Sequence, residues 1–179
     1  MMDYKTAQVR FEHWRQLGKY IFLVRDLAKL FPEDSPKTRK EGLNRLVKQG
    51  LLVRACRGVY VYPHGDGGDI HILERIATAL RRGEYNYVSL ESALSEYGAI
   101  SQIPLDRLTI MTTGRSGTYR TPFGTIEFTH TKRPVRELLL RMVDAGRPLR
   151  VATREAAWSD LKRVGRNCHL VDMEALHAD

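Results

Sequence analysis

The 179-residue chain has few cysteines and no long hydrophobic run. Cys56 and Cys168 are its two cysteines, and neither has a second Cys or a His at the spacing of metal ligands. This usage predicts neither a disulfide framework nor a zinc cluster, and it fits a reducing cytoplasm. No apolar run approaches the roughly 20 residues that span a bilayer, and the first fourteen residues are polar and amphipathic. We therefore expect a cytoplasmic protein with no membrane partner, no cofactor and no bound metal.

The composition is that of a globular protein, because 42% of the residues are hydrophobic and 28% are charged. The length suits one domain, but it also leaves room for a small module followed by a companion of about 110 residues. Composition alone keeps both arrangements open.

Positive charge is concentrated in the first third of the chain. The whole chain has a net charge of +8, and residues 1–62 contain thirteen Lys or Arg against six Asp or Glu. The remaining residues contain sixteen against fifteen, so almost all of the excess lies in the first part. A charge asymmetry of this kind indicates a nucleic-acid-binding module, because charge that only maintains solubility would be shared by both parts.

The first third contains the pattern of three helices and a hairpin. Residues 6–17 predict a helix with Val9, Phe11, Trp14 and Leu17 facing inward, followed by a short β-prone segment at 20–24. Residues 26–31 predict a second helix that ends at Pro32. A third helix is predicted at 36–49, opened by a Ser35 cap and Pro36 and ended by Gly50.

The third helix has an inward stripe and a polar outer face. Leu43, Leu46 and Val47 form the stripe, and β-prone runs at 51–56 and 59–62 follow as a hairpin. A basic helix face by itself is more often a solvated surface than a DNA contact. Here the face belongs to a helix, helix, basic helix and basic hairpin in the order of a winged helix-turn-helix, which predicts DNA binding through the third helix and the wing. The candidate contact residues are Ser35, Lys37, Thr38, Arg39, Lys40, Asn44, Arg45, Lys48, Arg54 and Arg57.

The polar stretch 64–69, HGDGGD, is interpreted as a linker rather than a metal site, so the predicted domains are 1–63 and 70–179. In the second domain we expect helices at 70–82, 89–96, 135–144 and 154–164, with Ser89 capping the second of them. We expect strands at 108–111, 118–121 and 124–129. The predicted fold class is therefore α+β, a winged helix followed by a domain with a small antiparallel sheet.

Two stretches of the second domain suggest enzymes. Residues 112–117, TTGRSG, have the composition of a phosphate-binding loop, but the Gly-Lys-Ser/Thr ending is missing and no helix follows, which favours a hairpin turn. Glu127, His130 and Lys132 suggest a nuclease site, but no upstream acidic partner is evident and strand alternation sends Glu127 and His130 to opposite faces. We therefore predict that the chain is not an enzyme.

Three stretches resemble the AbiEi-type antitoxins of type IV toxin-antitoxin systems. The first is FLVRDLAKLFPEDSPKTRKEGLNRLVKQGLLVRACRGVYVYP, from Phe22. The second and third are YVSLESALSEYGAISQIP, from Tyr87, and LTIMTTGRSGTYRTPFGTIEFTHTKR, from Leu108. The resemblance implies a bacterial autorepressor that binds double-stranded operator DNA, in inverted or direct repeats, and counters a nucleotidyltransferase-like toxin without a stable complex.

Two other functions remain open from the sequence. One is an ordinary winged-helix regulator whose second domain senses a ligand or dimerises, and the other is a DNA-processing enzyme. In either regulator we expect two molecules on a full operator site, because operator palindromy mirrors protein symmetry.

Overall fold

The computed structural model describes residues 2–63, 68–101 and 106–178. The chain divides into two compact units, Met1–Ile70 and His71–Asp179. Most of the linker expected at 64–69 falls on 64–67, outside the described residues. Each unit is described by itself below.

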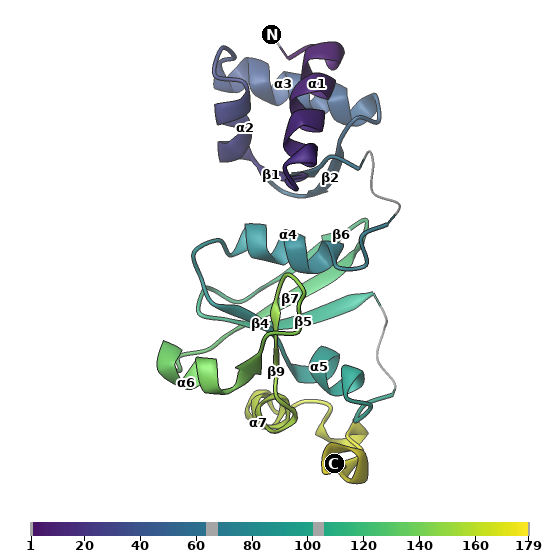
Figure 1. Cartoon of the computed structure of the whole chain (residues 1–179), viewed down its shortest axis with the longest axis vertical. Helices are drawn as coiled ribbons and strands as arrows, with labels where there is room; N and C mark the ends of the chain where they lie inside the picture. The colour runs from purple at the N-terminus through teal and green to yellow at the C-terminus, as the bar shows by residue number, and fades with distance from the viewer. Residues whose placement is uncertain (1, 64–67, 102–105, 179) are drawn as a thin grey trace. The chain divides into compact units, whose positions relative to one another are not determined.

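The first unit has three helices around a three-stranded sheet (Figure 1). Its elements are α1 (Tyr4–Gln16), β1 (Ile21–Leu23), α2 (Val24–Leu30), α3 (Pro36–Lys48), β2 (Val53–Cys56) and β3 (Val59–Val61). The strand order is β1-β3-β2 and both pairings are antiparallel. Helix, strand, helix, helix and two-stranded wing in this order make a winged helix-turn-helix, which confirms the predicted fold of this part.

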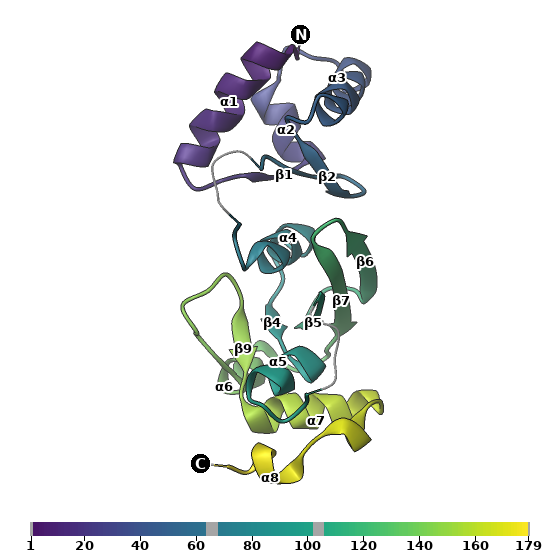
Figure 2. The same ribbon diagram turned by 90° about the vertical axis from the view of Figure 1, so that its right-hand side faces the viewer.

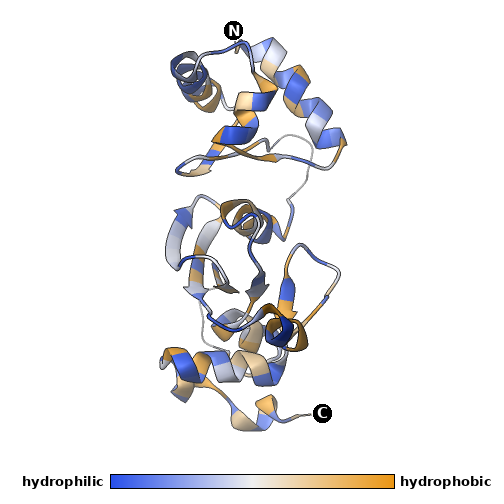
Figure 3. Cartoon of the chain, turned by 90° about the vertical axis from the view of Figure 1, so that its left-hand side faces the viewer, coloured by the Kyte–Doolittle hydropathy of each residue, from blue (hydrophilic) through white to orange (hydrophobic). Residues whose placement is uncertain are grey.

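Aromatic rings fill the core of the first unit. Phe11 from α1 is fully buried and packs against Phe22, Phe31 and Tyr62, with ring centroids 5.1, 5.8 and 5.6 Å away. Hydrophilic and hydrophobic residues alternate along the helices of this unit, as one buried face per helix requires (Figure 3).

The inward face of α1 differs from the one predicted. Ala7 and Phe11 are buried, whereas Val9 and Leu17 are each 65% exposed and Trp14 is 37% exposed. Only Phe11 of the predicted stripe therefore lies in the core. The small Ala7 one turn earlier lets α1 approach its neighbours, and Val9 and Trp14 line an open groove of about 490 Å³.

The local signals that predicted α3 are confirmed. Ser35 is the N-cap, and its Oγ accepts a hydrogen bond of 3.2 Å from the Thr38 amide. Pro36 occupies the first turn, and Gly50 has a φ of +78°, the left-handed conformation that glycine adopts without strain. Leu43 and Leu46 are buried.

The second unit is built on a six-stranded sheet with the order β6-β7-β5-β4-β9-β8. Its helices are α4 (Ile72–Leu80), α5 (Leu90–Glu96), α6 (Val135–Leu140), α7 (Arg154–Val164), the 3₁₀ helix η1 (Cys168–Leu170) and α8 (Met173–Leu176). Its strands are β4 (Asn86–Val88), β5 (Arg107–Thr112), β6 (Gly117–Thr121), β7 (Gly124–His130), β8 (Met142–Val143) and β9 (Arg150–Ala152). Helix α4 covers one face of the sheet, and α5 and α7 lie on the other (Figures 1 and 2).

The α+β class is confirmed, but the sheet is larger than predicted and is not purely antiparallel. Strands β5 and β7 pair in parallel, as do β4 and β9. The helix predicted at 135–144 ends at Leu140, and Met142–Val143 continues as strand β8 beside β9.

Ser89 occupies the N-cap position of α5, but the predicted side-chain cap is absent. Its hydroxyl instead donates a hydrogen bond of 2.7 Å to Asp160, a carboxylate that is 1% exposed. Tyr87 donates to the same carboxylate, and Arg141 forms an ion pair with it at 2.9 Å. The buried carboxylate of Asp160 needs hydrogen-bond donors, so the Ser89 hydroxyl bonds to it instead of capping α5.

The loop after β5 is not the hairpin turn that its composition predicted. A hairpin would place β5 beside β6, but β7 lies between them and pairs with both. Residues 113–116 must therefore cross the carboxyl end of β7, and the true hairpin joins β6 to β7. Gly124 in that hairpin has a φ of +137°, and a Cβ there would lie 2.4 Å from the Asp106 carbonyl oxygen.

Candidate nucleic-acid interface

Helix α3 presents most of its polar side chains to solvent. Lys37, Lys40, Asn44, Arg45 and Lys48 are exposed, and Thr38 is half-buried. Side chains of these types match the acceptors of base edges and phosphates in a major groove.

Six cations of α3 and the wing lack the carboxylate partner that three other cations of the same unit have. Arg10 pairs with Glu33 at 2.7 Å, Arg15 with Glu12 at 2.5 Å and Lys19 with Asp26 at 3.4 Å. Across the described residues, no ion pair is formed by six cations of α3 and the wing: Lys37, Lys40, Arg45, Lys48, Arg54 and Arg57.

Unpaired surface cations give a positive potential that paired ones largely cancel. The candidate interface is therefore defined by this lack of ion pairs as well as by the positions of its cations in the sequence.

Arg39 and Ser35 hold the turn between α2 and α3. The Arg39 guanidinium, through Nη2, donates to the Asp34 carbonyl at 2.8 Å and to the Phe31 carbonyl at 3.3 Å. Ser35 Oγ lies 2.9 Å from Thr38 Oγ1, in addition to its capping bond. Both side chains thus shape the start of α3, so their contribution to DNA contact is indirect in the proposal below.

The wing is a short hairpin with a register shift between Arg54 and Cys56. Arg54 and Arg57 are exposed, and Gly58 forms the turn with a φ of +78°. The turn therefore places two guanidinium groups on the rim of the wing, where flanking phosphates are contacted in this type of module.

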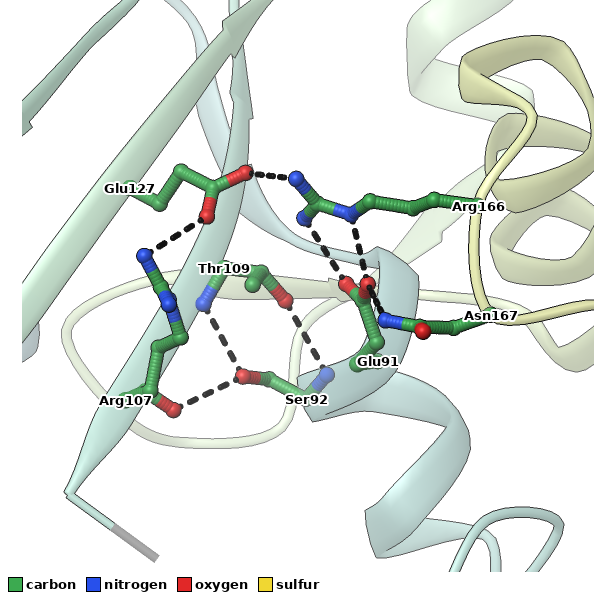
Figure 4. Close-up of a pocket in the computed structure, with 7 residues that line it drawn as sticks. All are labelled: Glu91, Ser92, Arg107, Thr109, Glu127, Arg166 and Asn167. Atoms are coloured by element: carbon green, nitrogen blue, oxygen red, sulfur yellow. Dashed lines mark hydrogen bonds and ion pairs between the residues drawn. The ribbon is translucent and has the colours of Figure 1, made fainter. Parts of the chain in front are cut away.

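A second candidate site is a cavity of about 260 Å³ in the second unit (Figure 4). Helix α5 contributes Glu91 and Ser92, β5 contributes Arg107 and Thr109, β7 contributes Glu127, and the segment after α7 contributes Arg166 and Asn167. Of the residues that line this cavity, only Glu127 was a catalytic candidate from the sequence, where no acidic partner for it was evident. The structure brings Glu91 to the same place.

Arg166 lies between the two carboxylates in Figure 4. Its Nε lies 2.6 Å from one oxygen of Glu91, its Nη2 lies 3.0 Å from the other, and its Nη1 contacts Glu127. Arg107 approaches Glu127 to 3.2 Å from the other side. A guanidinium thus stands where a catalytic metal would have to bind, and the cavity lacks the free carboxylates of a metal-dependent nuclease.

Burial alone would raise the pKa of Glu91, but hydrogen bonds from Arg166 and Asn167 hold it below its usual value. His130, the other residue of the suggested nuclease site, lies at the end of β7 and is exposed. Strand alternation separates it from Glu127, as predicted. The charged residues that line the cavity therefore form an ion-pair network, which connects the segment after α7 to α5 and the sheet.

The described residues were also considered as possible metal ligands and membrane-spanning helices. No group of three or more His, Cys, Asp or Glu side chains there is arranged to hold a metal ion. Among the helices in the same ranges, none is long and apolar enough to cross a membrane.

Comparison with known proteins gives one family and a similar solved structure. The family model described as "Transcriptional regulator, AbiEi antitoxin" matches residues 12–63. The crystal structure of the RV2827C protein from Mycobacterium tuberculosis matches with a TM-score of 0.57 and 15% sequence identity, over 85% of this chain. The chain spans 58% of the length of that protein, so this likeness concerns the fold. No curated protein matches the chain.

The family match falls on the unit that contains α3 and the wing. The winged-helix unit is therefore similar to that of the AbiEi antitoxin transcriptional regulators, and the match confirms over residues 12–63 the resemblance that the sequence motifs indicated.

Proposed function

We propose that this protein is a DNA-binding antitoxin that represses its own operon and counters a nucleotidyltransferase-like toxin. The observation that carries the DNA-binding part is the set of six cations on α3 and the wing without ion-pair partners. The family match over residues 12–63 supports the regulatory and antitoxin part.

In this proposal α3 enters the major groove of operator DNA. Lys37, Thr38 and Asn44 contact base edges, because they lie on the outer face of the helix and carry the donors and acceptors that discriminate bases. Lys40, Arg45 and Lys48 contact phosphates along the groove. Ser35 and Arg39 fix the angle of the helix through their bonds within the turn.

The wing extends the phosphate contacts to the side of the groove. Arg54 lies in β2 and Arg57 in the turn of the hairpin, so each reaches a different part of the neighbouring backbone. Two molecules bind one full operator site built from repeats, since each winged helix reads one half-site. Such pairing on DNA needs no stable dimer in free solution.

Repression is tested with a reporter gene placed behind the DNA that lies upstream of this gene. The wild-type protein should lower reporter expression, and Arg45→Ala/Lys48→Ala should restore it. Arg136→Ala/Arg163→Ala is the matched control, since it removes two exposed charges from the second unit. Repression that survives the α3 variant would contradict the proposed interface.

Antitoxin action is tested by co-expression with the product of the adjacent gene. The proposal expects the full-length protein to relieve growth arrest caused by a nucleotidyltransferase-like neighbour. The Arg45→Ala/Lys48→Ala variant, which cannot repress, separates the two tasks when the neighbour is expressed from an unrelated promoter. Failure of the wild-type protein to relieve arrest would favour an ordinary regulator whose second unit senses a ligand or dimerises.

A further inference from the structure

Arg81, directly after α4, is a buried cation that forms no ion pair in the described part of the chain. Its side chain is 6% exposed, and the guanidinium lies 4.3 Å from the ring centroid of Phe128 and 5.2 Å from that of Tyr119. Its Nε donates to the Arg115 carbonyl at 3.0 Å, and Nη1 donates to the Leu80 carbonyl and to the Tyr119 hydroxyl. In the part of the chain that the structure describes, no carboxylate lies within ion-pair distance of it.

Two other arginines of this unit form ion pairs. Arg141 pairs with Asp160 at 2.9 Å, and Arg147 pairs with Glu74 at 3.2 Å. The Nη2 atom of Arg81 is buried and has no hydrogen-bond partner among the described residues. Burying an unpaired charge is costly, and a nearby anion would reduce that cost.

The loop after β5 lies directly on this guanidinium. A Cβ at Gly117 would come within 3.3 Å of Arg81 Nη2, and a Cβ at Gly114 would come within 3.0 Å of Arg81 Cδ. The backbone of the loop therefore lies against the Arg81 side chain, and a Cβ at either glycine would be in tight contact with it.

One carbonyl of the loop is turned inward. Arg115 O accepts from the buried Arg81, whereas Gly114 O lies 2.6 Å from Nδ1 of the exposed His130. The peptide bonds are trans, so the N–H of the next residue points opposite to each carbonyl. The N–H of Ser116 thus points away from the core, where it can donate to an anion.

Further cations surround the same edge of the sheet. The side chains of Arg115, His130 and Lys132 are exposed, and neither Arg115 nor Lys132 has an ion-pair partner among the described residues. One carboxylate is close, that of Glu84, and it accepts a hydrogen bond of 2.5 Å from Thr113. The parallel strands β5 and β7 both end here, the edge at which sheets of this kind commonly bind ligands.

We propose that the loop 113–117, with Arg81 beneath it and Lys132 beside it, is a binding site for a phosphate group. The outward amide of Ser116 and the side chain of Arg115 contact the phosphate oxygens. Arg81 supplies positive charge from beneath the loop backbone. The phosphate belongs either to a DNA backbone or to a free phosphate compound, and both present the same tetrahedral anion.

The first arm of the test uses inorganic pyrophosphate and the purified full-length protein. Calorimetry should show binding that Arg115→Ala weakens about tenfold, the effect of losing one charge-assisted hydrogen bond. Arg163→Ala is the matched control and should bind as the wild type does. Amide resonances of Arg115 and Ser116 should shift on titration in a ¹⁵N-labelled sample.

The second arm uses double-stranded DNA. If the phosphate is that of a backbone, Arg115→Ala/Lys132→Ala should lower the slope of log affinity against log salt by about two units. The same double variant should then change the affinity for pyrophosphate less than it changes the affinity for DNA. Binding in the first arm with an unchanged DNA slope would identify a free phosphate compound as the ligand.

Arg81→Met separates the proposed role from a purely structural one. It keeps the length of the side chain and removes the unpaired charge, so the proposal expects loss of phosphate binding in a folded protein. If Arg81→Met unfolds, Arg115→Ala decides the test. The Arg115 side chain is exposed and forms no hydrogen bond or ion pair among the described residues. Unchanged pyrophosphate affinity, unshifted amides at 115 and 116, and an unchanged DNA slope would together overturn the proposal.

Discussion

Arg39→Ala should destabilise the first unit without lowering the salt dependence of its DNA affinity. Arg39 makes one short bond, 2.8 Å to the Asp34 carbonyl, and one long bond, 3.3 Å to the Phe31 carbonyl. A hydrogen bond to a charged donor contributes about 1.5–3 kcal/mol, so with the long bond counting little the loss is about 2 kcal/mol. In a unit of this size that corresponds to a fall in Tm of about 8–16 °C.

The assay follows the fluorescence of Trp14 during thermal unfolding, in a Trp158→Phe background so that only the first unit is observed. Arg25→Ala is the matched control, because Arg25 is an exposed arginine of α2 with no ion-pair partner in the described ranges. Operator affinity is then measured where the variant remains folded. A Tm unchanged by Arg39→Ala, or a salt slope lowered by one unit, would show that Arg39 contacts phosphate instead.

Three further changes concern the second unit. Asp160→Ala leaves Arg141 and two hydroxyls without their buried acceptor, and it should lower the free energy of unfolding by about 3–5 kcal/mol in urea titration. The lowered pKa of Glu91 contributes stability above its ordinary value of 4.5, and this contribution is lost as the pH falls through the folded-state pKa. Glu91→Gln should therefore flatten the acid limb of a stability–pH curve, and an unaltered limb would refute the assignment. Gly124→Ala meets a backbone carbonyl and should lower Tm more than Gly146→Ala, whose Cβ enters open space.

The elements predicted best from the sequence were those fixed by neighbouring residues. Helix α3 began and ended where Ser35, Pro36 and Gly50 indicated, because capping and left-handed stops act within one turn. The wing followed from two β-prone runs around Gly58 for the same reason. Helix α7 was likewise predicted at its observed bounds, 154–164.

The features that were missed depend on residues far apart in the chain. The pattern of α1 offered several apolar residues, and only the shape of the partner helices decides that Phe11 is buried while Val9 is exposed. The strand pairing of the second unit had no local signal, since β7 lies between β5 and β6.

The cavity of the second unit was hidden for the same reason. Glu91 and Arg166 are 75 residues apart, and nothing near either residue indicates the other. Arg81 was also missed, because the sequence places it in an ordinary basic pair at the end of a helix. Its lack of a counter-charge becomes visible only when its surroundings are known.

The central claim is that α3 binds operator DNA through its unpaired cations, and the salt dependence of operator affinity tests it most directly. We predict that Arg45→Ala/Lys48→Ala weakens binding and lowers the slope of log affinity against log salt by about two units, one for each lost phosphate contact. The charge-matched Arg136→Ala/Arg163→Ala variant should keep the wild-type slope. An unchanged slope in the α3 variant, with the protein folded, would contradict the account.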